Sequence, residues 1–178
     1  DTLSQYREVF TFPIEDYYKR VGFDFDKIPF SMLAHEYMED YQEKSYACDL
    51  HSDVLDVVNK AKNLGFSQTV LSASKMDYLL KQMKTLHVDD LFDPIYGIND
   101  IYAKSKVELA HAFKQTCSLD DEIYFVGDSV HDYEVAKSIG AKCILVTTGH
   151  QNRATLESVN VPVMDSLMES LDLIYERD

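Results

Sequence analysis

The sequence predicts an α/β protein in which a small helical module precedes a doubly wound parallel sheet. In residues 50–178, short apolar segments alternate with segments of helical spacing, which is typical of a parallel sheet with helices on both faces. Residues 1–49 are rich in Tyr, Phe, Asp and Glu and contain few β-branched residues, so we expect about three helices there. The boundary between the two parts is therefore expected at residues 49 and 50.

Within the helical module, apolar and aromatic side chains recur at the spacing of a helix face. They do so at Leu3, Tyr6, Val9 and Phe10, and again at Met32, Leu33, Tyr37 and Tyr41. Pro13 and Pro29 divide the segment. We interpret the aromatic side chains as packing residues rather than as a surface that binds a ligand.

From residue 50, the expected elements follow one another closely. The predicted strands are residues 68–72, 94–97, 123–126 and 142–146, and a last apolar fragment covers 161–164. The predicted helices run from Ser52 to a stop at Gly65, from Ser74 through Leu86, over 105–116, over 132–139 with a stop at Gly140, and over 165–176. The sequence contains no internal repeat and no low-complexity tract.

The run from Ile123 to Asp132 carries the strongest chemical signal. Four apolar residues lead into Gly127, and Asp128 and Asp132 follow at the carboxyl end of a strand that we expect to be buried. In an open α/β sheet, this is the edge where ligands bind. Two carboxylates there suit Mg²⁺, which prefers oxygen ligands and accepts phosphate as a further ligand. The alternative is that both carboxylates only cap the following helix.

Two further strand ends carry groups that suit a phosphate. The first predicted strand ends at Ser72, and Ala73 and Ser74 lead into a helix whose free backbone N–H groups, with the hydroxyl, would form an oxyanion site. After the second predicted strand come Lys104 and Lys106, which can hold a phosphate oxygen and offset charge in a transition state. A helix-capping serine and a solvated lysine are the alternatives. The joint presence of these groups at one sheet edge favours a phosphoryl-transfer site.

Composition excludes several classes of partner. The 178 residues carry a net charge of −14 with a pI near 4.7, so nucleic acids and anionic membranes would be repelled. The three cysteines, Cys48, Cys117 and Cys143, form no CxxC pair and are typical of a reducing compartment. Because no apolar run approaches the ~18 residues of a membrane span, we expect a cytoplasmic protein.

Three segments resemble motifs of the haloacid dehalogenase-like hydrolases. Val70–Ser72, Ser105–Lys106 and Val126–Asp132 are similar to the second, third and fourth motifs of that family, and the GDSxxD run is the most specific. The closest branch is the phosphoglycolate phosphatase-like one, which has a small helical cap. The resemblance covers essentially the whole chain. It implies that residues 1–49 are part of the cap and that residues 50–178 are a Rossmann-like core.

The resemblance also implies a role for each candidate residue. Ser72 and Ala73 would bind the transferring phosphoryl group, and Lys106 would bind and stabilise it. Asp128 would ligate Mg²⁺, and Asp132 would support the metal or position Lys106. Lys104, which precedes the same helix, is the alternative to Lys106 for the phosphate-binding role.

The chain departs from this family in its first motif, an Asp-x-Asp on a first strand. There the first carboxylate is the nucleophile and the second is the general acid and base. The only Asp-x-Asp of this chain, Asp24-Phe-Asp26, lacks the expected strand and turn, and we interpret it as a loop. The family places the first strand at the centre of the sheet. We therefore expect it, with its nucleophile, in an upstream segment of roughly 30 to 40 residues, and we expect residues 1–178 alone to be inactive.

The expected function is Mg²⁺-dependent hydrolysis of a small phosphorylated metabolite through an aspartyl-phosphate. Two alternatives keep the same fold: a phosphosugar mutase of the same branch, and a non-catalytic binding or regulatory protein without the nucleophile. A different nucleotide-dependent enzyme has no support, because neither GxGxxG nor GxxxxGK[ST] occurs. Neither GxSxG nor HExxH occurs either, so serine hydrolases and zinc proteases also lack support.

Overall fold

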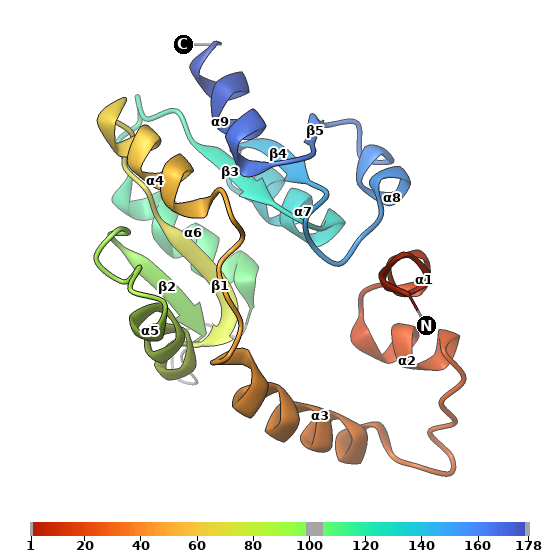
Figure 1. Ribbon diagram of the computed structural model, residues 1–178. Helices are drawn as coiled ribbons and strands as arrows, with labels where there is room; N and C mark the ends of the chain where they lie inside the picture. Colours follow the sequence, from red (N-terminus) through yellow and green to blue (C-terminus); the bar gives the residue numbers. More distant parts are fainter. Residues whose placement is uncertain (1, 99–104, 177–178) are drawn as a thin grey trace.

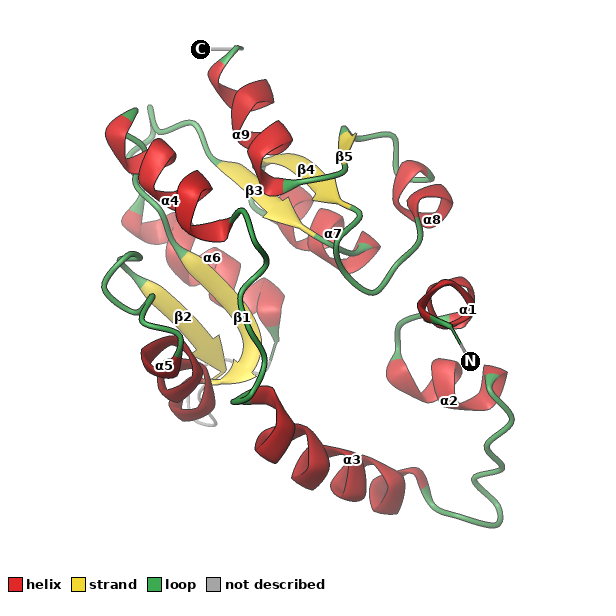
Figure 2. Cartoon of the chain, in the orientation of Figure 1, coloured by secondary structure: helices red, strands yellow, loops and turns green. Residues whose placement is uncertain are grey.

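The computed structural model describes residues 2–98 and 105–176 (Figures 1 and 2). The expected helical module consists of α1 (Leu3–Val9), α2 (Ile14–Arg20) and α3 (Phe30–Ser45). A capping box between Thr2 and Gln5 begins α1, and Pro13 and Pro29 occupy the N-cap positions of α2 and α3. In Figure 1, α3 runs from the α1–α2 pair to the sheet.

The rest of the described chain alternates strands and helices, as predicted. The strands are β1 (Val70–Lys75), β2 (Ile95–Ile98), β3 (Tyr124–Gly127), β4 (Lys142–Val146) and β5 (Val163–Met164). The helices are α4 (Val54–Asn63), α5 (Met76–Thr85), α6 (Lys106–Thr116), α7 (Val130–Ser138), α8 (Arg153–Glu157) and α9 (Leu167–Tyr175). Gly65 and Gly140 follow α4 and α7 with φ of +90° and +70°, which confirms the two predicted helix stops.

The strands form two separate sheets, and every strand pair is parallel. β1 pairs with β2, while β4 pairs with β3 on one side and β5 on the other. Within residues 2–98 and 105–176, no strand pairs β1 with β3, although these are the strands by which the two sheets approach each other in Figure 1. The central strand expected between them stays a prediction.

Helices cover both faces of the strands and join the two sheets. α6 and α7 pack together on one face, and α4 and α9 pack together on the other (Figure 1). A buried cluster of Ala110, Val135 and Ile139 contacts Leu71 in β1 and Phe125 in β3. Burial of this shared apolar surface therefore holds the sheets together in place of backbone hydrogen bonds.

One predicted boundary is wrong in a way that affects the candidate site. We expected a strand ending at Ser72 and a helix opening at Ser74, but β1 continues to Lys75 and α5 begins at Met76. The Ser74 N–H donates to the Ser72 hydroxyl oxygen instead of opening a helix, and the pairing of β1 with β2 becomes irregular after Leu71. Ser72 therefore lies inside a strand and not at a helix N-terminus.

Other boundaries shift because local capping decides where a helix begins. α7 starts at Val130 and not at residue 132, since Ser129 and Asp132 form a capping box. Asp53, not Ser52, occupies the N-cap position of α4. The short helix α8 was not predicted, and its N-cap Asn152 accepts a hydrogen bond from the Thr155 N–H at 2.9 Å.

Two further expectations concern the domain boundary and membrane-spanning helices. The division between residues 49 and 50 stays a prediction. Among the helices within residues 2–98 and 105–176, none is both long enough and apolar enough to cross a membrane.

Candidate functional site

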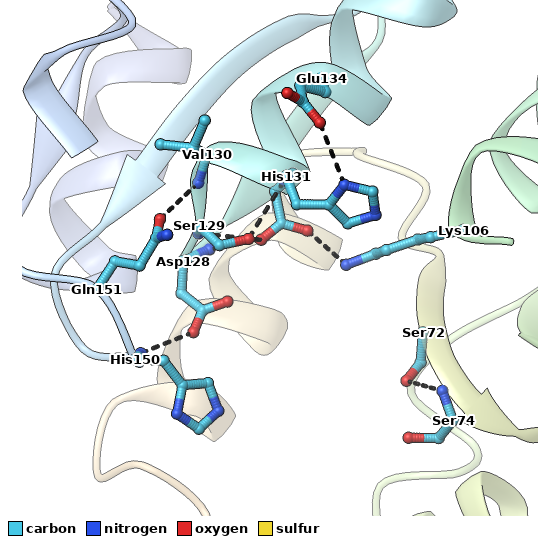
Figure 3. Close-up of polar contacts among 11 residues, drawn as sticks. Ser72, Ser74, Lys106, Asp128, Ser129, Val130, His131, Glu134, His150 and Gln151 are labelled. Carbon is cyan, nitrogen blue, oxygen red and sulfur yellow. Dashed lines mark hydrogen bonds and ion pairs between the residues drawn. The ribbon is translucent and has the colours of Figure 1, made fainter. Parts of the chain in front are cut away.

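The fold brings three of the predicted site residues to neighbouring strand and helix ends, and it places a fourth, Ser72, inside a strand. Asp128 follows β3, Asp132 lies in the first turn of α7, and Lys106 is the first residue of α6. Ser72 lies in β1, on the far side of Lys106 from Asp128 in Figure 3. These groups come from three segments that are far apart in the sequence, and they meet because parallel strands direct their carboxyl ends to one edge.

Asp132 and Lys106 form a buried ion pair at the centre of the site. The Lys106 Nζ lies 2.5 Å from the Asp132 Oδ1, and their side chains are 18% and 3% exposed. The other oxygen of Asp132, Oδ2, accepts hydrogen bonds from the Asp128 N–H, the Ser129 N–H and the Ser129 hydroxyl, at 3.1, 3.1 and 2.7 Å. Both oxygens of this carboxylate are therefore occupied by donors of the protein itself.

The contacts of Asp132 also fix its charge. Burial on its own would raise the pKa of this carboxyl group, because a charged group is disfavoured away from water. The positive charge and hydrogen bond of Lys106, with the hydrogen bonds from Ser129 and Asp128, outweigh burial and hold the pKa of Asp132 below its usual value. At neutral pH, the site therefore contains an ionised Asp132.

Asp128 is half-buried and has fewer partners within the protein. Its Oδ2 accepts a hydrogen bond from the backbone N–H of His150 at 3.2 Å, and its other oxygen points away from His150 (Figure 3). The chain passes very close on this side, since a Cβ added at Gly149 would lie 1.6 Å from the Asp128 Oδ2. A Cβ at Gly127 would likewise lie 2.3 Å from the Cβ of Asp132. Both carboxylates are thus packed against positions that only glycine can occupy.

The remaining phosphate-binding candidates are less closely connected. The Ser72 hydroxyl accepts the Ser74 N–H at 3.1 Å, and Ala73 is exposed within β1. Lys106 is directed toward Asp132, and its Nζ also lies 5.6 Å from the centre of the Phe125 ring. Lys104, the alternative lysine, lies outside the described residues. The ion pair with Asp132 gives Lys106 a defined place in this site.

The oxygen atoms at this edge fit Mg²⁺ if phosphate completes the ligand set. Mg²⁺ is commonly bound through one or two carboxylates and the phosphate of the substrate, with water in the other positions. Asp128 can supply such a carboxylate, whereas the donors around Asp132 favour the positioning role over direct ligation. Within residues 2–98 and 105–176, no group of three or more His, Cys, Asp or Glu side chains is arranged to hold a metal ion by itself.

Several residues of this site were not predicted. His150 contacts Asp128 through its backbone, and the buried Gln151 accepts a hydrogen bond from the Val130 N–H at 2.7 Å. The signal that could have found them is their position directly after the fourth predicted strand, at the same sheet edge as Asp128. The contact of His150 uses its backbone N–H, and the neighbouring Gly149 has no side chain, so neither contribution can be recognised from the type of residue.

Comparison with known proteins points to one family. A family model described as haloacid dehalogenase-like hydrolase matches residues 2–146 of this chain. No curated protein sequence matches the chain significantly. Three solved structures with a similar fold are each less than 25% identical to this chain, so their likeness bears on the fold alone.

These three structures come from different bacteria. A haloacid dehalogenase-like family hydrolase from Streptococcus pneumoniae is 21% identical with a TM-score of 0.81, and the match covers 98% of this chain and 81% of that one. A predicted phosphatase from Clostridium acetobutylicum is 19% identical with a TM-score of 0.77 and coverages of 99% and 83%. A predicted phosphoglycolate phosphatase from Haemophilus somnus 129pt is 17% identical with a TM-score of 0.65 and coverages of 90% and 76%.

Proposed function

This chain belongs to the haloacid dehalogenase-like hydrolase family, and from that premise we propose that it is a Mg²⁺-dependent phosphomonoester hydrolase acting on a small phosphorylated metabolite. The observation that carries the proposal is the buried Lys106–Asp132 pair beside the half-buried Asp128. A cation held by one carboxylate, next to a second carboxylate with one oxygen that points away from His150, suits a phosphoryl group and a divalent metal.

In this proposal each residue has a separate task. Lys106 binds an oxygen of the phosphoryl group, and the Ser72 hydroxyl and the Ala73 backbone bind others. Asp128 ligates Mg²⁺, which when bound offsets negative charge on the phosphoryl oxygens. Asp132 holds the Lys106 ammonium group in place through their buried ion pair.

We place the nucleophile on a strand that pairs with both β1 and β3 and that lies outside the described residues 2–98 and 105–176. β1 and β3 do not pair with each other, and helices pack across both sheets. The facing edges of β1 and β3 therefore leave backbone donors and acceptors that such a strand would satisfy. Its aspartate attacks phosphorus as the bond from phosphorus to the ester oxygen breaks. A second carboxyl group, in its acid form, gives its proton to that oxygen, which leaves as the alcohol. Water then hydrolyses the aspartyl-phosphate, which releases inorganic phosphate and restores the nucleophile.

The direct test is release of inorganic phosphate by the full-length protein from a panel of small phosphomonoesters. With Mg²⁺ present we expect turnover of at least one ester. Excess EDTA should reduce the rate more than about a hundred-fold, because the charge on the phosphoryl oxygens is no longer offset, and added Mg²⁺ should restore it. Turnover that persists in EDTA would contradict the metal role. No turnover of any ester would favour the non-catalytic alternative.

The two candidate lysines can be separated in the same assay. Lys106→Ala should lower kcat about 10²–10³-fold, the loss typical of removing one preorganised group that stabilises the transition state. Lys104→Ala should stay within about three-fold of the wild type. Circular dichroism of both variants checks that the folded content is retained, since Lys106→Ala also leaves Asp132 without its partner. The reverse order of effects would assign the phosphate-binding role to Lys104.

The proposal also covers the molecule that the protein binds and its location in the cell. A small phosphorylated metabolite is the expected partner, and the acidic chain disfavours nucleic acids. We propose a cytoplasmic location, which is supported by the free state of Cys48, Cys117 and Cys143.

A further inference from the structure

The segment Thr148–Asn152, which we call the 148–152 segment, lies between helix α1 and the Asp128 carboxylate. On the side of the candidate site, the His150 N–H donates to the Asp128 Oδ2 at 3.2 Å. The Val130 N–H donates to the Gln151 Oε1 at 2.7 Å, so the segment also contacts the first turn of α7. Figure 3 shows both contacts on the same side of Lys106.

On its other side, the same segment is held by aromatic residues of the helical module. The Tyr6 hydroxyl lies 2.7 Å from the His150 Nδ1. The Phe10 ring stacks on the His150 imidazole, with ring centres 4.9 Å apart and planes 24° apart, and Phe10 is buried. The backbone N–H of His150 thus contacts Asp128 while its ring is fixed by α1 and the residue that follows it.

Arg7 strengthens this attachment with two hydrogen bonds, one that it donates and one that it accepts. The Arg7 Nη2 donates to the Thr148 carbonyl oxygen at 3.2 Å, and the Asn152 Nδ2 donates to the Arg7 carbonyl oxygen at 3.3 Å. These bonds hold both ends of the 148–152 segment to α1, and the His150 ring holds its middle. A displacement of α1 would therefore move the segment as a unit.

The ionisation of Tyr6 suits a lasting hydrogen bond. Burial, followed by the nearby Tyr17, raises the pKa of Tyr6 to about 12. The phenol therefore keeps its proton at neutral pH, and it can donate to the Nδ1 whenever the imidazole carries its proton on the Nε2.

We propose that His150 is a positioning residue that couples the docking of α1 to the orientation of Asp128. The metal site is then complete only while α1 lies on the 148–152 segment, so that a shift of the helical module weakens Mg²⁺ binding. This rests on the proposed function in one respect, namely that Asp128 is a metal ligand. Gly149 makes the coupling tight, because the backbone beside the Asp128 Oδ2 leaves no space for a side chain.

The test is a calorimetric titration of the full-length protein with Mg²⁺, together with KM and kcat for phosphate release. His150→Ala and Tyr6→Phe should each raise the Kd for Mg²⁺ about 10-fold, the lower end of the range for residues that orient a metal ligand. His150→Asn keeps a polar atom near the Nδ1 position and should restore most of the affinity. Tyr41→Phe is the matched control, since Tyr41 lies on α3 and stacks on Tyr37.

The outcomes separate this inference from the function on which it rests. If His150→Ala and Tyr6→Phe bind Mg²⁺ like the wild type while Asp128→Asn does not, the coupling is wrong and the metal assignment stands. If Asp128→Asn binds Mg²⁺ as tightly as the wild type, the metal assignment itself fails. A loss in Tyr41→Phe equal to that in Tyr6→Phe would also overturn the coupling, because the effect would then not depend on the contact with His150.

Discussion

Asp128→Asn in the full-length protein is expected to abolish Mg²⁺-dependent phosphate release. The substitution keeps the size of the side chain and an oxygen that can accept the His150 N–H, but it removes the negative charge that would attract the metal. We expect a fall of more than about a hundred-fold in kcat/KM, beyond the loss typical of residues that only support a metal ligand. The measurement is steady-state phosphate release across a range of Mg²⁺ concentrations.

The matched control for this variant is Asp172→Asn. It makes the same change of charge on α9, at a surface pair with Lys60 that lies outside the candidate site. Activity should be unchanged within about two-fold, because an exposed pair contributes little. Wild-type-like Mg²⁺-dependent turnover in Asp128→Asn would eliminate Asp128 as a metal ligand.

The second large effect is expected on stability. Asp132→Ala should lower the free energy of unfolding by about 3–5 kcal/mol, since removing one partner of a buried ion pair leaves the other charge without compensation. It also removes the acceptor for three hydrogen bonds and the capping box of α7. Urea-induced unfolding, followed by circular dichroism, measures this loss.

Asp172→Ala is the appropriate comparison, because it removes the aspartate of another aspartate–lysine pair. The Asp172–Lys60 side chains are 51% and 45% exposed, against 3% and 18% for Asp132 and Lys106. We expect a cost below about 1 kcal/mol there. Equal costs for the two variants would mean that burial of the Lys106–Asp132 pair does not contribute as described.

The contribution of Asp132 to stability should depend on pH with a defined sign. Its pKa is lower in the folded protein than the usual 3.8, so the unfolded chain binds a proton more readily. This part of the stability is therefore fully present above pH 3.8 and is lost as the pH falls through the lower pKa of the folded protein. The difference in unfolding free energy between the wild type and Asp132→Asn should consequently shrink in acid. A difference that grows in acid would contradict the assigned shift.

Much of the fold could be predicted, because the chain signals its elements by local pattern. The strand at Lys142–Val146 was predicted residue by residue, since its buried residues Cys143–Val146 form an unbroken apolar run. The helix at Lys106–Thr116 was placed to within one residue. The short helix α8 was missed, because five residues carry too little periodicity to be distinguished from a loop.

The candidate site could be predicted only in part. Asp128, Asp132 and Lys106 were found because charged residues at strand ends are visible in a sequence. The pairing of Lys106 with Asp132 and the contact of His150 with Asp128 depend on tertiary packing, which brings together residues 26 and 22 positions apart. Ser72 was assigned to the end of a strand and Ser74 to a helix start, because Ser is a common cap, but the strand in fact extends to Lys75.

The closeness of Gly127 and Gly149 to the two carboxylates has a consequence for natural variation at this site. Neither residue supplies a functional group, yet a methyl group at either position would collide with Asp132 or Asp128. Selection that maintains the two carboxylates must therefore also maintain Gly127 and Gly149, which contribute only by lacking a side chain. In a screen of disabling substitutions, such positions would be indistinguishable from those of the reacting groups, although their contribution is purely steric.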